Sequence, residues 1–273
     1  MKVIVRFALI FVLSALPAFA HKHETGFLDR TLKFQGNSYR YQVYVPSDYD
    51  PHQAWPVILF LHGSGERGDD GLIQTEVGIG SAIRRSRGKV QAIVVMPQLP
   101  EKKIWPDEDM SAMALAELDA AVHEFHGDTH RLYLTGLSNG GYGTWDIAAT
   151  HPGKFAAIVP VCGGLHAPSD MPELTSAFVR DPKVTDPYAE VAKRIGSTAT
   201  AVWIFHGADD PVVSVEESRK MAAALRAAGA SVKYTEFPAT GHNAWDQAYA
   251  EPGLFDWMLA HSLAHADNKA AKP

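Results

Sequence analysis

The sequence of 273 residues predicts an α/β fold in which a mostly parallel sheet carries helices on both faces. Short apolar runs, typical of strands that are covered on both sides, recur along the chain. Segments of helical length separate these runs, and such alternation favours parallel strands joined by helical crossovers. The composition, with 46% apolar and 21% charged residues, is that of a globular protein and excludes a disordered or fibrous one.

The individual elements follow from their patterns. Residues 27–34 and 39–45 alternate in the manner of a β-hairpin. Residues 111–125 form an amphipathic helix, because Ala114, Leu118 and Phe125 fall on one face. Residues 164–200 hold four prolines and predict a small excursion over the edge of the sheet. The remaining strands are expected at 57–62, 91–96, 131–135, 156–161, 201–205 and 232–237, and the remaining helices at 139–149, 218–228 and 253–263.

The N-terminus has the features of a secretory signal peptide. Lys2 and Arg6 precede an apolar run at 7–16, and Ala18-Phe19-Ala20 is an Ala-x-Ala cleavage site. We expect cleavage after Ala20, a single α/β domain over 21–273, and a secreted or periplasmic protein. An amphipathic helix or a membrane anchor is the alternative, but the complete set of signal-peptide features argues against it, so no stable membrane anchor is expected.

Charge and cysteine content exclude several classes of protein. The formal net charge of −6 leaves no basic footprint for nucleic acid or for an anionic membrane surface. Cys162 is the one cysteine, which excludes a disulfide framework and a zinc site built on several thiolates. We expect this thiol to be buried and inert.

A candidate nucleophile lies in the segment Gly136-Leu137-Ser138-Asn139-Gly140, between a predicted strand and a predicted helix. Glycines two positions before and after the serine allow a sharp turn, which exposes the hydroxyl above the sheet at a helix N-terminus. An ordinary glycine-rich turn is the alternative, and the strand–turn–helix setting argues against it.

An acid and a base follow later in the chain. Asp209 and Asp210 come after the strand at 201–205, and His242 follows the strand at 232–237. Each has a structural alternative, since acids often cap loops and a lone histidine is usually structural. However, the order serine, acid, histidine, each after its own strand, is that of the α/β-hydrolase triad and differs from the two other common serine-triad folds.

The glycine-rich loop after the strand at 57–62 supplies a candidate oxyanion hole. We expect the backbone N–H groups of Ser64, from this loop, and of Asn139, directly after the serine, to face the reacting carbonyl. A phosphate-binding loop is excluded because no Gly-Lys-Ser/Thr follows the glycines.

The chain resembles secreted serine carboxylesterases of the α/β-hydrolase superfamily, in the branch related to polyhydroxybutyrate depolymerases and feruloyl esterases, some of which are labelled predicted peptidases. The resemblance implies Ser138 as nucleophile, Asp210 rather than Asp209 as acid, His242 as base and Ser64 as oxyanion donor. It implies no metal and no cofactor. It says least about residues 165–184, where we expect substrate choice to be set. The matching segments are LHGSGERG (61–68), GLSNGGYGTW (136–145), VPVCGG (159–164), DPYAEVAKRIG (186–196), VWIFHGADDPVV (202–213) and GHNAWDQAY (241–249).

These features predict an exported hydrolase of short acyl or aryl esters, including acetyl or feruloyl groups linked to polysaccharide. Trp105 and Trp245 are candidate substrate contacts, with a place in the core as the alternative for each. A peptidase or a lipase of the same fold is a second possibility, although we expect a lipase to have a larger apolar lid and a peptidase to have an added domain. A binding protein that kept the fold is a third, and the complete triad argues against it. The sequence indicates neither the ester nor the oligomeric state.

Overall fold

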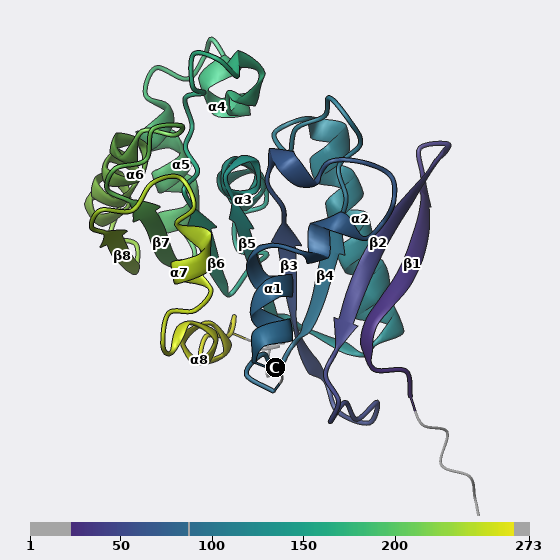
Figure 1. Ribbon diagram of the computed structural model, residues 1–273. Coiled ribbons are helices and arrows are strands. Elements are labelled where there is room, and N and C mark those ends of the chain that lie inside the picture. Colours follow the sequence, from purple (N-terminus) through teal and green to yellow (C-terminus); the bar gives the residue numbers. More distant parts are fainter. Residues whose placement is uncertain (1–22, 87, 265–273) are drawn as a thin grey trace, which may run out of the picture.

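The computed structural model describes residues 23–86 and 88–264, so the predicted signal peptide and its cleavage site lie outside the described residues. Eight strands form one sheet, with helices on both sides (Figure 1). The strands are β1 (Gly26–Phe34), β2 (Asn37–Val45), β3 (Trp55–Leu61), β4 (Ile93–Pro97), β5 (Gly127–Leu137), β6 (Ala157–Val161), β7 (Ala201–Gly207) and β8 (Val232–Phe237). The helices are α1 (Gly78–Arg85), α2 (Glu108–Glu124), α3 (Asn139–Thr150), α4 (Ala177–Arg180), α5 (Pro187–Gly196), α6 (Val215–Ala227), α7 (Trp245–Ala248) and α8 (Leu254–Leu259), with 3₁₀ turns η1 (Ser64–Glu66), η2 (Ile73–Thr75) and η3 (Pro172–Leu174).

The strand order is β1-β2-β4-β3-β5-β6-β7-β8. β1 and β2 form an antiparallel hairpin, turned by Gln35 and Gly36 at positive φ, and β2 pairs antiparallel with β4. All pairs from β4 to β8 are parallel. The predicted mostly parallel sheet is confirmed. Because β3, β5, β7 and β8 run the same way, the loops that follow them meet at one edge of the sheet.

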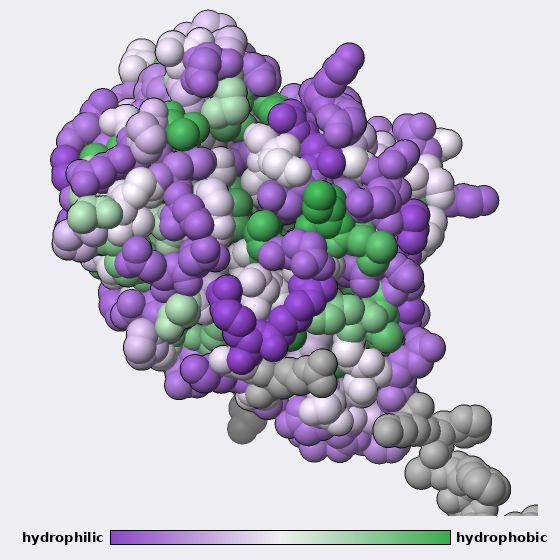
Figure 2. All heavy atoms as spheres, viewed as in Figure 1, coloured by the Kyte–Doolittle hydropathy of each residue, from purple (hydrophilic) through white to green (hydrophobic). Residues whose placement is uncertain are grey.

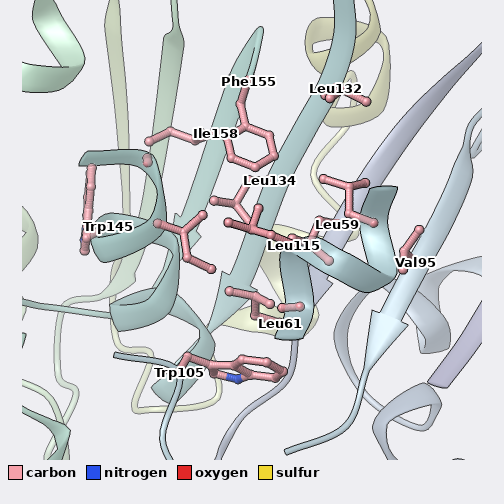
Figure 3. Packing of buried hydrophobic residues seen from close by; sticks show 14 of the residues in the cluster. Leu59, Leu61, Val95, Trp105, Leu115, Leu132, Leu134, Trp145, Phe155 and Ile158 are labelled. Atoms are coloured by element: carbon pink, nitrogen blue, oxygen red, sulfur yellow. The ribbon is translucent and has the colours of Figure 1, made fainter. Parts of the chain in front are cut away.

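The two faces of the sheet carry two separate apolar cores. In β3, Val57, Leu59 and Leu61 point to one face, and Ile58 and Phe60 to the other. The first face packs against α2, α3, α5 and α6, and Figure 3 shows leucines of β3 and β5 packed there with Phe155 and Ile158. The second face packs against α1, α7 and α8. Burial on both faces explains why these strands are continuous apolar runs.

Several elements differ from the sequence expectations. α6 begins three residues earlier than expected, because the hydroxyl of Ser214 accepts a hydrogen bond from the N–H of Glu216 and caps the helix. α8 is shorter than expected and covers 254–259. α1 was not expected at all; its buried residues are small or β-branched, a composition that does not distinguish a helix from a strand.

The predicted excursion at 164–200 is present but holds more regular structure than the prolines indicate. α5 packs between α3 and α6, because Val191, Ala192 and Ile195 form a buried stripe. Asp186 caps α5 and Pro187 occupies its first turn, where a proline needs no hydrogen bond. The part before α5 stands out from the body, with α4 at the top of Figure 1.

Two buried carboxylates hold the excursion on the body. Asp146 of α3 accepts hydrogen bonds from the hydroxyl of Ser176 and, at 2.8 Å, from the N–H of Ala177. Glu217 of α6 accepts from the N–H groups of Leu165 and His166, at 2.8 and 3.0 Å. The excursion is therefore attached through buried polar contacts at both α3 and α6.

The viewed surface is mostly polar, with apolar side chains gathered between α1 and β2 (Figure 2). Among the described residues, the large apolar side chains that are exposed are Leu72 and Ile73, in the loop between β3 and α1. That loop also carries the glycine-rich segment 63–68. No helix within the described ranges is long and apolar enough to cross a membrane.

Candidate active site

Ser138 lies at the sharp turn between β5 and α3, with φ 52° and ψ −117°. This strained conformation is held by the backbone: the N–H of Ser138 donates to Val161 O at 2.9 Å, and its carbonyl accepts from the N–H of Gly141 at 2.8 Å. A Cβ at Gly140 would lie 1.9 Å from the carbonyl oxygen of Leu61, so only glycine allows α3 to pass this close to β3. The turn therefore presents the serine hydroxyl above the carboxyl edge of the sheet.

His242 and Asp210 complete a line of hydrogen bonds with this serine. His242 Nε2 lies 2.9 Å from Ser138 Oγ, and His242 Nδ1 lies 2.8 Å from Asp210 Oδ2. Nδ1 faces a carboxylate and so carries the hydrogen, which leaves the lone pair of Nε2 facing the serine hydroxyl. The three residues come from the loops after β5, β7 and β8, as their positions in the sequence predict.

The carboxylate of Asp210 is buried and surrounded by donors. Oδ1 accepts from the N–H groups of Val212 and Val213, at 2.8 and 3.0 Å. Oδ2 faces His242 and also His206 Nε2, at 3.2 Å. Burial alone would raise the pKa of Asp210, but the hydrogen bonds outweigh it and hold that pKa well below its usual value. The neighbouring Asp209 is exposed, and its backbone N–H donates to the carbonyl oxygen of Thr240 at 3.0 Å.

Ser64 and Asn139 face one another across the site. Each occupies the first position of a helical turn, η1 and α3 respectively, where the turn itself offers no acceptor for the N–H group. The side chain of Asn139 links the loops: its amide donates to Ser64 Oγ at 3.3 Å, and its carbonyl accepts from Trp105 N at 3.1 Å. In the described part of the chain neither N–H group has a hydrogen-bond acceptor, as the predicted oxyanion hole requires.

His62 holds the glycine-rich loop from below. Its Nε2 accepts from Leu99 N at 3.0 Å, so Nδ1 carries the hydrogen and donates to Gly63 O at 2.5 Å. Complete burial lowers the pKa of His62 to about 4, so the ring is neutral at physiological pH. Arg67 adds a hydrogen bond to Ser64 O at 2.9 Å. Because C=O and N–H point to opposite sides of a trans peptide, holding Gly63 O also orients the N–H of Ser64.

The two tryptophans differ. The prediction that Trp105 contacts substrate is wrong for this structure, because its side chain is fully buried, packs against Gly143 and donates from Nε1 to His62 O at 2.9 Å (Figure 3). Trp105 instead joins two loops of the site from inside. Trp245 is half-buried and meets the ring of His242 edge to face, at a centroid distance of 5.4 Å.

Cys162 lies beside these residues and is buried, as expected. Burial raises the pKa of its thiol far above the usual value, so it is a poor nucleophile. Within residues 23–86 and 88–264, Cys162, Asp210 and His242 form the one group of side chains close enough to share a metal ion. A metal there would break the hydrogen bond between Asp210 and His242, so the donor set fits the hydrogen-bonded line better than a metal site.

The sequence analysis missed the roles of two histidines, His62 and His206. Both lie inside glycine-containing motifs at the ends of central strands, and that placement is the available signal. Each histidine has one partner farther along the chain, Leu99 for His62 and Ser218 for His206, and the folded loops bring the nearer partners into contact, which no local pattern reveals.

An eight-stranded, mostly parallel sheet with a serine at the β5–α3 turn defines the α/β-hydrolase fold. The chain belongs to the prolyl oligopeptidase family, whose model matches residues 105–266. The resemblance to the α/β-hydrolase superfamily is thereby confirmed.

Three further proteins are similar to this chain. A structure described as a thermostable esterase is 30% identical, with a TM-score of 0.71 over 86% of this chain. An uncharacterized secreted protein of Arthroderma benhamiae is 26% identical over 71% of this chain, and the putative esterase NocK of Nocardia uniformis is 29% identical over 41%. The chain spans 63%, 22% and 34% of the lengths of these three proteins, respectively.

Proposed function

We propose that this chain is an exported serine hydrolase that cleaves carboxylic esters through an acyl-enzyme on Ser138. The observation that carries the proposal is the line of hydrogen bonds from Ser138 through His242 to Asp210, at 2.9 and 2.8 Å. It lies at a strained turn, beside two N–H groups at the first positions of η1 and α3. Nucleophile, base, orienting acid and oxyanion donors are the parts that acyl transfer requires.

In the proposed mechanism, His242 Nε2 takes the proton of Ser138 Oγ as the oxygen attacks the ester carbonyl. The N–H groups of Ser64 and Asn139 stabilise the resulting oxyanion. His242 then protonates the departing alcohol, and the acyl group remains on Ser138. Water, activated by His242, hydrolyses the acyl-enzyme by the same route, while Asp210 stabilises the imidazolium in both halves.

Apolar side chains near the acid loop support an apolar acyl or aryl group as substrate. Val212, whose N–H binds Asp210, is half-buried at the edge of a small apolar cluster separate from the two cores. Trp245, against His242, would supply an aromatic face for the same group. We include acetyl and feruloyl groups linked to polysaccharide in this class. The buried members of the cluster are Ile104, Tyr142, Leu174 and Val213, and Ala167 and Met171 pack against it.

Export rests on the N-terminal segment. The basic start, apolar run and Ala-x-Ala site of residues 1–20 support cleavage after Ala20. The similarity to a secreted protein of Arthroderma benhamiae agrees with this. N-terminal sequencing of the protein recovered from the periplasm or the medium tests it, and a product that begins at Met1 contradicts it.

Hydrolysis of a nitrophenyl ester series tests the activity. Residues 21–273 and the Ser138→Ala variant are compared on esters from acetate to decanoate and on methyl ferulate. We expect Ser138→Ala to lower kcat by about 10⁵-fold or more, because the nucleophile is lost while the fold is kept. Equal rates for the two proteins at pH 7 to 9 would contradict the proposal, and the chain-length profile would size the acyl site.

Peptide hydrolysis is the second candidate, and the match to the prolyl oligopeptidase family favours it. The same line of hydrogen bonds serves amide cleavage, but an amine is a poorer leaving group than an alcohol. Comparing kcat/KM for a peptidyl nitroanilide with that for a nitrophenyl ester of the same acyl part separates the two. A higher kcat/KM for the nitroanilide would make the protein a peptidase.

A further inference from the structure

A second imidazole, that of His206, contacts the same carboxylate oxygen of Asp210 as His242 does. His206 lies near the end of β7, and its side chain is fully buried. The next residue, Gly207, lets the loop that carries His242 approach, because a Cβ there would lie 2.3 Å from the carbonyl oxygens of Thr240 and Gly241. The end of β7 therefore brings His206, Asp210 and the base loop into one packed unit.

The contacts of His206 determine where its hydrogen lies. Nε2 faces two acceptors, Val213 O at 3.0 Å and Asp210 Oδ2 at 3.2 Å. Neither can donate when Asp210 is ionised, so Nε2 carries a hydrogen in either protonation state of the ring. Nδ1 lies 2.7 Å from the hydroxyl of Ser218, a buried residue of α6. Ser218 thus occupies the second nitrogen and fixes the orientation of the ring.

Asp210 Oδ2 consequently lies between two N–H donors, one from His206 and one from His242. A carboxylate that accepts a second hydrogen bond holds each donor less strongly and is less basic. His206 therefore determines in part how strongly Asp210 attracts the protonated form of His242. Because the side chain of Asp210 is fully buried, bulk water does not replace a hydrogen-bond donor that a substitution removes.

The other titratable groups that surround His206 and Asp210 are either neutral or bound by other residues. Cys162, from the end of β6, and Tyr142, from α3, face Asp210, and burial raises the pKa of both far above neutrality. Glu236 of β8 faces His206 but is bound by Arg219 at 2.6 Å. Glu217, which neighbours Ser218, is bound by Tyr188 and by two backbone N–H groups. Asp210 is thus the charge that the two imidazoles share.

We propose that His206 is a positioning residue of the active site, which holds Asp210 in place and sets the pH range in which His242 works as a base. This inference rests on the proposed function of Ser138, His242 and Asp210. It extends the hydrogen-bonded line from three residues to five: Ser138, His242, Asp210, His206 and Ser218.

Three variants test it. His206→Phe keeps the ring volume and removes the donor, whereas His206→Gln keeps an N–H near the position of Nε2. Ser218→Ala leaves both imidazoles and removes only the partner that orients His206. The readouts are the pH profile of kcat/KM on nitrophenyl acetate, the rate of labelling of Ser138 by a fluorophosphonate, and the melting temperature.

We expect His206→Phe to move the acid limb of the profile upward by about one pH unit, because the unshared carboxylate stabilises a protonated His242 more strongly. In His206→Gln the acid limb should lie near its wild-type position, and in Ser218→Ala it should shift upward by less than in His206→Phe. A merely structural role would lower the melting temperature or the amplitude of the profile without moving its limb.

The outcomes separate the inference from the function. An active wild type whose acid limb is unchanged in His206→Phe and Ser218→Ala overturns the inference alone. If esters are not hydrolysed, the pH profile of fluorophosphonate labelling carries the same test, because it needs an activated Ser138 and no particular substrate. A wild type that neither hydrolyses esters nor reacts with the fluorophosphonate overturns both.

Discussion

Two buried carboxyl groups, one at the carboxyl edge of the sheet and one in the α2 layer, have opposite protonation behaviour. Asp210, in the β7–α6 loop, receives hydrogen bonds from two backbone N–H groups and two imidazoles, and its pKa lies well below the usual value. Glu117 of α2 is buried, neither of its oxygens has a hydrogen-bond partner among the described residues, and its pKa lies well above the usual value.

Burial raises the pKa of both groups, so donors make the difference. The loops after parallel strands bring backbone N–H groups and distant side chains to Asp210, whereas α2 buries Glu117 where neither of its oxygens receives a hydrogen bond from the described residues. Asp146 of α3 is intermediate: it is buried, has two donors, and its pKa is raised to about 6. The donors around Asp210 therefore favour its ionised form beside His242, whereas burial without donors favours the protonated form of Glu117.

Among these carboxyl groups, the largest effect is expected at Asp210. Asp210→Asn should lower kcat by about 10⁴-fold, because an amide cannot hold His242 in the required tautomer. Steady-state hydrolysis of nitrophenyl acetate measures it. Asp209→Asn is the matched control, since the side chain of Asp209 is exposed, and it should leave kcat within about twofold. A loss at Asp209 equal to that at Asp210 would reverse the assignment of the acid.

Substitution of Asp146 should loosen the excursion at 164–200 and leave the active site intact. Asp146→Ala leaves the hydroxyl of Ser176 and the N–H of Ala177 without their partner, so unfolding free energy should fall by about 2–4 kcal/mol. Urea titration measures this, and limited proteolysis should cut within 166–186 faster. Asp119→Ala, at an exposed ion pair with Lys154, should cost less than about 1 kcal/mol. Asp146 lies outside the hydrogen-bonded line of the site, so a folded Asp146→Ala protein should still hydrolyse nitrophenyl acetate. Loss of that activity would contradict this prediction.

Asp146 should also make stability depend on pH. The folded protein binds a proton at Asp146 more tightly than the unfolded chain, because the pKa rises from 3.8 to about 6. The contribution of Asp146 to the unfolding free energy is therefore greatest below pH 4, falls by about 3 kcal/mol between pH 4 and 6, and stays constant above pH 6. The difference in unfolding free energy between wild type and Asp146→Asn, followed over this range, isolates the effect. A difference that does not change with pH would mean that Asp146 is ionised throughout.

The smallest effect is expected at Glu117, with the opposite sign. Glu117→Leu should raise the unfolding free energy at pH 8 by about 1–2 kcal/mol, because it removes a buried polar group that has no partner. The gain should be smaller at pH 4, where the unfolded chain also keeps the proton and the cost of neutralising the carboxyl disappears. Destabilisation that is larger at pH 8 than at pH 4 would show that Glu117 is ionised and paired.

The order of strands and helices could be read from the sequence because burial on both faces leaves continuous apolar runs, as in β3 and β7. α5 was hidden by the prolines around it, although Pro187 lies in the first turn, where proline favours a helix. Trp105 was misjudged because its place in a loop indicates exposure, while its indole is held inside by the carbonyl of His62, a residue far away in the sequence.

The sequence by itself determined that the loops with the three candidate catalytic residues lie together. Ser138, Asp210 and His242 each follow a parallel strand, and the carboxyl ends of parallel strands share one edge of a sheet. Only the tertiary structure decided the direction of the N–H of Ser64, the burial of Trp105 and the place of His206 beside Asp210. These depend on hydrogen bonds between residues that are distant in sequence or that only the folded loop brings together, and hydropathy and spacing carry no information about such partners.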